Sequence, residues 1–88
     1  MQIIQTEKWS NDPNRDFEIY TYRDNNNDRL VIKTAETTKG RRYKLEDIHR
    51  EIPMKGEWNL KPHEYAGYEK ALTEVKSSIL IHCQLTNV

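Results

Sequence analysis

Two neighbouring stretches of the chain, 17–23 and 28–36, mix apolar, aromatic and β-branched residues with polar ones. Such stretches predict β-strands, in which successive side chains point to opposite faces. One aspartate and three asparagines separate the stretches at 24–27. These residues favour turns, so the pattern predicts an antiparallel hairpin with its tip at 24–27.

The charges of the two stretches favour one register for this hairpin. Like charges directly opposite each other on antiparallel strands are destabilising. The register that pairs Arg23 with Asp28 also pairs Glu18 with Lys33, and both pairs are complementary. A shift of one residue would instead set Arg23 against Arg29, so we expect the first register.

A second turn is predicted at Lys39 and Gly40, after which a third strand returns along the second. Glycine at the turn supplies the positive backbone angle that tight hairpins need. This turn pairs Glu36 with Tyr43, and further from the turn it pairs Lys33 with Glu46. The pattern therefore predicts a three-stranded antiparallel meander.

The two sides of this meander differ in composition, and the more apolar side is the expected core face. The core face is predicted to hold Phe17, Ile19, Thr21, Leu30, Ile32, Thr34, Tyr43 and Leu45. The outer face is predicted to hold Glu18, Tyr20, Tyr22, Arg29, Val31, Lys33, Ala35, Arg42, Lys44 and Glu46.

The N-terminal residues alternate poorly, so the sequence leaves open whether residues 2–9 form a fourth, edge strand. Further along the chain, Leu45, Ile48 and Ile52 recur at offsets of three and seven residues. This spacing predicts about one helical turn, which Pro53 would end.

Residues 47–61 are expected to form a connector, with Trp58 and Leu60 packed against the domain. A helix is predicted at about 62–83, with Pro62 in its first turn, where the missing N–H costs nothing. Residues at three- and four-residue steps would cover the core face with one apolar stripe: Tyr65, Tyr68, Leu72, Val75, Ile79 and Cys83.

The last residues, 79–87, allow two interpretations, a continuation of the helix or a terminal strand. The helix is favoured. Leu80 and Ile81 extend the apolar stripe beyond what one face needs, so a homodimer contact or a partner protein is expected to cover them.

These patterns predict a single α+β domain, a small antiparallel three- or four-stranded β-meander (sheet about 2–46) with one C-terminal α-helix packed on one face. In outline this plan resembles the small sheet-and-helix DNA-binding arms of some mobile-element integrases. In size the chain is similar to small accessory proteins of phages and mobile elements, and this resemblance implies binding and blocking of a host protein.

Composition limits the function classes. The chain has 88 residues, of which 35% are apolar, so its core must be small. Fourteen basic and fourteen acidic residues give a formal net charge of zero, which argues against a general binder of nucleic acid or of membrane surfaces. Cys83 is the single cysteine, and we find neither a secretory signal nor an apolar run of about 20 residues. We therefore expect a cytoplasmic protein with no membrane partner.

Metal, cofactor and catalytic sites are not indicated. Asp24, Asn26 and Asp28 match the opening of a calcium loop, but Arg29 replaces the required glycine and Ala35 the bidentate acid. A hairpin tip rich in turn-forming residues explains the same pattern.

The side chains that could bind a soft metal, His49, His63, His82 and Cys83, lack the paired spacing of a zinc site. Cys83 could serve as a nucleophile, but on an apolar stripe it is better explained as a small core residue. We expect no enzyme, no catalytic residue, no metal and no cofactor.

The remaining feature is the mixed aromatic and basic outer face. We predict a partner-binding surface there, formed by Tyr20, Tyr22, Arg29, Lys33, Arg42 and Lys44. The favoured function is a small non-enzymatic protein-binding module, an inhibitor or adaptor of a host protein. The alternative is a nucleic-acid-binding domain that uses the same face.

Overall fold

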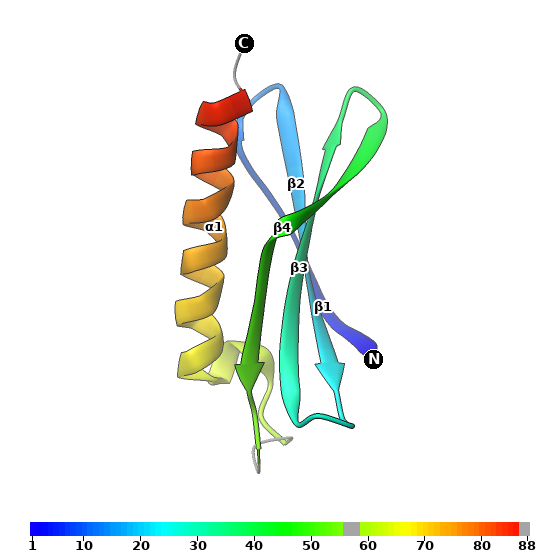
Figure 1. Cartoon of the computed structure of the whole chain (residues 1–88), viewed down its shortest axis with the longest axis vertical. Coiled ribbons are helices and arrows are strands. Elements are labelled where there is room, and N and C mark those ends of the chain that lie inside the picture. Colours follow the sequence, from blue (N-terminus) through cyan, green and yellow to red (C-terminus); the bar gives the residue numbers. More distant parts are fainter. Residues whose placement is uncertain (56–58, 87–88) are drawn as a thin grey trace.

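The computed structural model describes residues 1–55 and 59–86, and of Asn11 the backbone alone. Its elements are β1 (Gln2–Asp12), β2 (Arg15–Asp24), β3 (Arg29–Thr38), β4 (Arg41–Pro53), the 3-10 helix η1 (Pro62–Glu64) and α1 (Ala66–Thr86). The strands form one antiparallel sheet in the order β1-β2-β3-β4, and α1 runs along one side of it (Figure 1). This confirms the α+β meander with a C-terminal helix, and it shows that the sheet has four strands.

The core lies between α1 and the facing side of the sheet. From the helix, Tyr68, Val75 and Ile79 are buried, as the predicted stripe requires, while Cys83 is half-buried at its far end. The main sheet and connector residues of this core are Phe17, Ile19, Leu30, Ile32, Ile48, Ile52 and Met54. Leu60 packs against it as predicted, and Trp58 lies outside the described residues.

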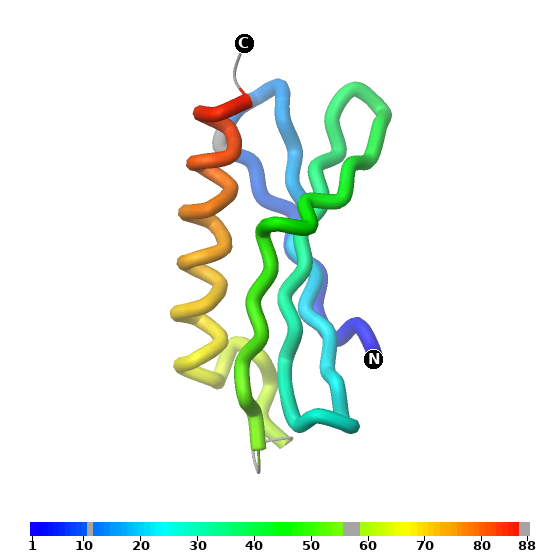
Figure 2. The backbone as a smooth tube through the Cα atoms, in the orientation of Figure 1, coloured from blue at the N-terminus to red at the C-terminus, as the bar shows by residue number. Residues whose placement is uncertain are grey.

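The C-terminal segment is helical through Thr86, so the strand interpretation is wrong for residues 79–86, and residue 87 lies outside the described residues (Figure 2). The helix begins later than the predicted residue 62, because Pro62 starts the short η1 and α1 follows only from Ala66. The N–H of Tyr68 donates to the carbonyl of Tyr65, which opens the first turn of α1.

Residues 2–9, for which the sequence left the question open, do form an edge strand, and this strand continues to Asp12. The loop that follows is tight, because β2 already begins at Arg15. The backbone N–H of Asn14 donates to Oδ1 of Asp12 at 2.8 Å, which is the local bond that makes aspartate a good turn residue.

The register of the β2–β3 hairpin differs from the predicted one by two residues. Asp24, not Arg23, closes the turn and pairs with Arg29, so the tip lies at 25–28. The carboxylate of Asp24 accepts bonds from Nδ2 of Asn27 at 2.9 Å and from Nε of Arg29 at 2.8 Å. These bonds hold the pKa of Asp24 down at about 2 and fix the register. Because the error is two residues, each side chain keeps its predicted face.

The β3–β4 hairpin has the predicted register only near its turn. Glu36 pairs with Tyr43 as expected. The predicted pair of Lys33 with Glu46 is wrong, because Lys33 lies opposite His49. The register therefore changes by three residues partway along β4.

A bulge in β4, at residues 45–48, causes this change, since these four residues lie opposite Thr34 alone. The Thr34 hydroxyl lies 3.3 Å from the carbonyl oxygen of Leu45 and 3.2 Å from that of Ile48, so it bonds the bulge from inside the sheet. Beyond the bulge the strand resumes and continues to Pro53. The helical turn predicted after Leu45 and the connector predicted to begin at 47 are therefore wrong.

Three side chains are more exposed or more buried than we expected from the face on which each was predicted to lie. Tyr43, predicted in the core, is 49% exposed, because the tip of the β3–β4 hairpin leans away from α1 (Figure 1). Val31 and Ala35, predicted on the outer face, are buried. They lie on a central strand, where larger residues on β2 and β4 flank them; Tyr22 and Glu51 are the register partners of Val31.

Removing one buried hydroxyl should measurably destabilise the fold. The hydroxyls of Thr21 and Tyr68 are 2.8 Å apart in the core. Tyr68→Phe leaves the Thr21 hydroxyl buried without its partner, so we expect a loss of about 1–3 kcal/mol in the free energy of unfolding, measured by urea titration. In the control, Tyr65→Phe removes a hydroxyl that donates to the Pro53 carbonyl at the exposed surface. The control should lose less than about 1 kcal/mol, and equal losses would contradict the buried role of the Thr21–Tyr68 bond.

Candidate functional site

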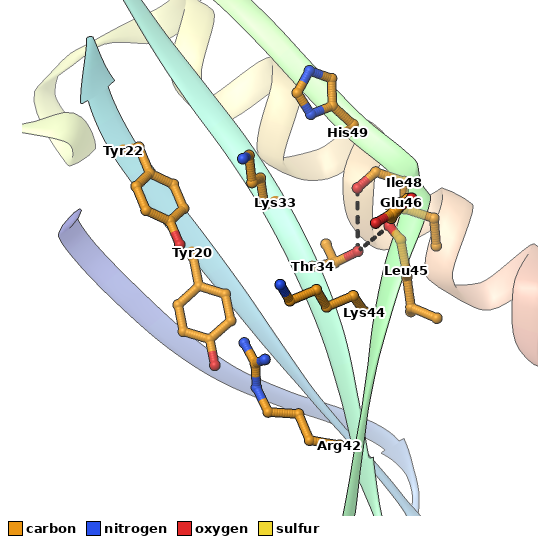
Figure 3. Close-up of a pocket in the computed structure, with 10 residues that line it drawn as sticks. All are labelled: Tyr20, Tyr22, Lys33, Thr34, Arg42, Lys44, Leu45, Glu46, Ile48 and His49. Atoms are coloured by element: carbon orange, nitrogen blue, oxygen red, sulfur yellow. Dashed lines mark hydrogen bonds between the residues drawn. The ribbon is translucent and has the colours of Figure 1, made fainter. Parts of the chain in front are cut away.

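The outer face of the sheet contains a hollow of about 340 Å³, which we call the tyrosine groove (Figure 3). It is lined from β2, β3 and β4 by Tyr20, Tyr22, Lys33, Thr34, Arg42, Lys44, Leu45, Glu46, Ile48 and His49.

Strand periodicity brings the polar lining residues together. Tyr20 and Tyr22 are two residues apart on β2, and Arg42 and Lys44 are two residues apart on β4, so each pair shares a face. Lys33 lies on β3, the strand between β2 and β4, and is directly opposite Tyr20. The structure therefore gathers five of the six predicted partner-binding residues around one groove.

Two cations of the chain lie against the tyrosine rings. The guanidinium carbon of Arg42 is 5.2 Å from the centre of the Tyr20 ring, and Nζ of Lys33 is 5.4 Å from the centre of the Tyr22 ring. At these distances a cation is attracted by the ring quadrupole. Each tyrosine ring of β2 thus has a cation over it, Lys33 from the neighbouring β3 and Arg42 from β4 beyond it, and these contacts restrict the rotamers of both partners.

The Tyr20 hydroxyl lies in a partly desolvated and charged setting. Burial raises the pKa of Tyr20 above its ordinary value, and Glu18 adds to this increase, while Arg42 opposes it. The interaction with Tyr20 in turn raises the pKa of Arg42. Tyr20 therefore presents a neutral hydroxyl to the groove at physiological pH.

The positive charge of the groove is only partly balanced. Nε of Arg42 lies 3.9 Å from Oε1 of Glu18, and within the described residues neither Lys33 nor Lys44 forms an ion pair. The register explains this, because Glu18 lies opposite the small Ala35 and not opposite Lys33. The cross-strand charge ladder that the predicted register implied is therefore absent.

Arg29, the sixth predicted residue, lies outside the groove. Its guanidinium donates to Asp24 at 2.8 Å through Nε and to Glu51 through Nη1. Both carboxylates belong to neighbouring strands, since Asp24 ends β2 and Glu51 lies on β4. Arg29 therefore stabilises the end of the sheet at which the β2–β3 turn lies.

The sequence patterns missed part of the groove because residues 45–53 were interpreted as helical. His49 lines the groove, and it does so only because β4 continues beyond the bulge. Strand alternation was present in the sequence at this point, with Ile48, Arg50 and Ile52 on one side and His49 on the other. An offset of four between Ile48 and Ile52 fits both periods, which is why the two interpretations competed.

A second polar cluster, also missed, lies at the end of α1 on the other side of the sheet. Arg15 donates to Glu36 twice, at 2.7 and 2.9 Å, and Oγ1 of Thr38 donates to Glu36 at 2.7 Å. Nη1 of Arg15 also donates to Thr86 at 2.9 Å, and Nε2 of His82 is 3.4 Å from Glu36. These bonds, above all those from Arg15, lower the pKa of Glu36 to about 2. We call these five residues the Glu36 cluster.

The soft side chains are dispersed. In the part of the chain that the structure describes, no group of three or more histidine, cysteine, aspartate or glutamate side chains is placed to hold a metal. Cys83 is half-buried, and burial raises the pKa of its thiol. A raised pKa leaves less of the nucleophilic thiolate at neutral pH.

The exposed side of α1 carries large apolar side chains near its end. Leu80 is 40% exposed, Ile81 57% and Leu85 80%. The homodimer predicted through Leu80 and Ile81 stays a prediction. None of the helices that the structure describes combines the length and the apolar composition that crossing a bilayer requires.

The groove and the Glu36 cluster are thus two organised polar sites on opposite sides of the sheet. The groove is open and mixed in character, whereas in the Glu36 cluster the carboxylate is already bonded by neighbouring side chains. Comparisons with family models, curated proteins and solved structures give no match for this chain.

Proposed function

We propose that the protein is a small non-enzymatic binding module that docks a partner protein against the tyrosine groove. The observation that carries this proposal is the grouping of Tyr20, Tyr22 and Arg42 in one groove, with Lys33 and Lys44 at its sides. Tyrosine and arginine are enriched among the residues that contribute most to binding energy at protein interfaces.

Partial ordering of these anchors supports the proposal. Arg42 and Lys33 already rest on the rings of Tyr20 and Tyr22. A long side chain that is held before binding loses less entropy when a partner arrives. The strands position the anchors without a flexible loop, which favours a specific contact.

In this proposal the module acts in the cytoplasm as an inhibitor or adaptor, in the manner of the small phage and mobile-element accessory proteins that it resembles in size. Binding is its whole activity, and it occupies a surface of the host protein. The same groove could alternatively bind nucleic acid, and that candidate is favoured by Lys33 and Lys44, neither of which forms an ion pair with a described residue. The zero net charge of the whole chain favours a protein.

The test is a pull-down with matched variants. Tyr20→Ala combined with Arg42→Ala removes two anchors from the groove. Tyr43→Ala combined with Arg41→Ala removes the same residue types from the other face of β4, where both side chains are exposed. Partners retained by the wild-type protein and by the control, but lost by the groove variant, are identified by mass spectrometry, and their affinities are then measured with purified components.

We expect the groove variant to weaken partner binding by about 100-fold or more, the size typical of losing two interface hot spots. The control should stay within about threefold of the wild-type protein. Equal retention of partners by the groove variant, with folding verified by circular dichroism, would overturn the proposal. Retention of single-stranded or duplex nucleic acid at low salt, lost steeply as salt rises, would instead support the alternative.

A further inference from the structure

Some basic side chains of the described structure lie beside a carboxylate and others do not. Outside the tyrosine groove several of them lie close beside a carboxylate of the same chain: Arg15 beside Glu36, Arg29 beside Asp24 and Glu51, and Lys76 beside Glu7. Around the tyrosine groove the cations outnumber the carboxylates. Three cations line it against one carboxylate, in a chain whose formal net charge is zero.

The individual side chains show where this imbalance lies. Arg42 is 3.9 Å from Glu18, a long separation for an ion pair, and 47% of its side chain is exposed. Lys33 and Lys44 are exposed and form no ion pair with any described residue. Three cationic groups at one groove are thus available to an anionic partner.

Their spacing favours an extended ligand. Arg42 and Lys44 are at alternate positions of β4, so they are separated by about 6.8 Å along the strand. Alternate side chains of any extended peptide repeat at the same distance. Carboxylates at every second residue of such a peptide would therefore match the two cations, and Lys33 on the adjacent strand would lie within reach of a third.

We propose that the tyrosine groove docks an extended acidic segment of the partner protein, with alternate glutamate or aspartate side chains facing Arg42, Lys44 and Lys33. This inference rests on the function proposed above, because it specifies which part of a partner the groove accepts. The Arg42 guanidinium offers a carboxylate a planar pair of N–H donors. The tyrosine rings beneath the cations exclude water from one side and so strengthen the attraction.

The same geometry disfavours a nucleic acid strand. Sequence-tolerant binding of single strands depends on bases that stack on aromatic rings. Arg42 and Lys33 occupy one face of the Tyr20 and Tyr22 rings, so a base that stacks there must displace a cation that would otherwise contact phosphate.

The experiment uses two capped eight-residue peptides, one of alternating glutamate and threonine and one with glutamine in place of glutamate, together with an eight-nucleotide thymidine strand. Each is titrated into the isotopically labelled 88-residue protein at low salt, and amide chemical shifts report both the site and the dissociation constant. We expect the glutamate peptide to shift amides on β2, β3 and β4 around the groove. Its affinity should exceed that of the glutamine peptide by at least 10-fold.

Two charge-matched variants identify the cations that matter. The double variant Lys33→Gln, Lys44→Gln should lower the affinity for the glutamate peptide at least 10-fold. The control, Lys39→Gln with Arg41→Gln, removes the same charge from the turn and the opposite face, and it should change this affinity less than twofold. Equal weakening by both variants would overturn the proposal, since it would show a general charge effect. Tighter binding of the thymidine strand or equal binding of the glutamine peptide would also overturn it.

The two proposals can fail separately. If a captured partner depends on Tyr20 and Arg42 but not on Lys33 and Lys44, the acidic-segment inference is wrong and the protein-binding function stands. If the glutamate peptide binds at the groove while partners bind the Tyr20→Ala and Arg42→Ala variant normally, the proposed function of the groove is wrong, although its preference for carboxylates is real.

Discussion

Ile79→Ala should lower the free energy of unfolding by about 2–5 kcal/mol, whereas Leu80→Ala should lower it by less than about 1 kcal/mol. The two residues are adjacent and of equal size, but Ile79 is 0% exposed in the core and Leu80 is 40% exposed on the outer side of α1. Truncation of Ile79 leaves a cavity between the helix and the sheet, while truncation of Leu80 removes atoms that already contact water.

The measurement is urea unfolding followed by circular dichroism, with the slopes of the transitions compared to check that the unfolded states are alike. If Ile79→Ala is too unstable to study, Ile79→Val should cost about 0.5–1.5 kcal/mol. Equal losses at the two positions would contradict the burial pattern of α1. A loss for Leu80→Ala that grows with protein concentration would instead support the predicted homodimer through Leu80 and Ile81.

Glu36→Gln should cost about 2 kcal/mol of stability at pH 7, and this cost should disappear in acid. The folded protein holds the pKa of Glu36 at about 2, well below the ordinary value of 4.5, chiefly through the bonds from Arg15. The ionised form is therefore favoured by folding, and the stabilisation is complete above about pH 4.5. It is lost as the pH falls from there towards 2, because the unfolded chain binds the proton first. The figure of about 2 kcal/mol allows for solvent screening at the rim of the cluster.

The wild-type protein and the variant are compared by thermal unfolding at several pH values between 2 and 7. Asp24 also has a pKa of about 2, so both proteins will lose some stability in acid, and the quantity of interest is the difference between them. Glu74→Gln serves as the control, since Glu74 is half-exposed and 3.9 Å from Arg50. It should change stability by less than about 1 kcal/mol. A difference for Glu36→Gln that stays constant down to pH 2 would contradict the role of its charge.

The sequence predicted which face of the sheet most side chains occupy, although it did not predict the register of the β2–β3 hairpin. Period-two alternation placed Tyr20, Tyr22 and Lys33 on one side, and a register error of two residues leaves that side unchanged. Pairing of charges chose the wrong register because Arg23 and Asp28 looked complementary, whereas Asp24 closes the turn with bonds from its own tip. Local side-chain bonds of this kind are decided by geometry that a linear pattern does not contain.

Most of the groove was also predictable, for the same reason. Arg42 and Lys44 alternate with Tyr43 next to a turn whose register was right. That Arg29 lies outside the groove was not foreseen, because its partner Glu51 comes from a part of β4 that looked helical. The bulge that separates the two parts of β4 is bonded by the hydroxyl of Thr34, a contact between strands that spacing along the chain does not reveal.

The Glu36 cluster could not be predicted from spacing within one element, because its members come from three elements. Arg15 begins β2 and Glu36 lies on the paired strand β3, whereas Thr86 ends α1, so the full cluster forms only when the helix packs beside this hairpin. Sequence patterns describe neighbours within an element well. They describe the meeting of elements poorly.

The strand order has a consequence for how the chain folds. Every strand pairs with its neighbour in sequence, so the sheet can assemble hairpin by hairpin, each step closing only a short loop at little entropic cost. The bond between Arg15 and Thr86 joins residues 71 positions apart and therefore closes nearly the whole chain at once. We therefore expect the local hairpins to form first during folding. The Glu36 cluster would be completed last, when the end of α1 reaches the start of β2.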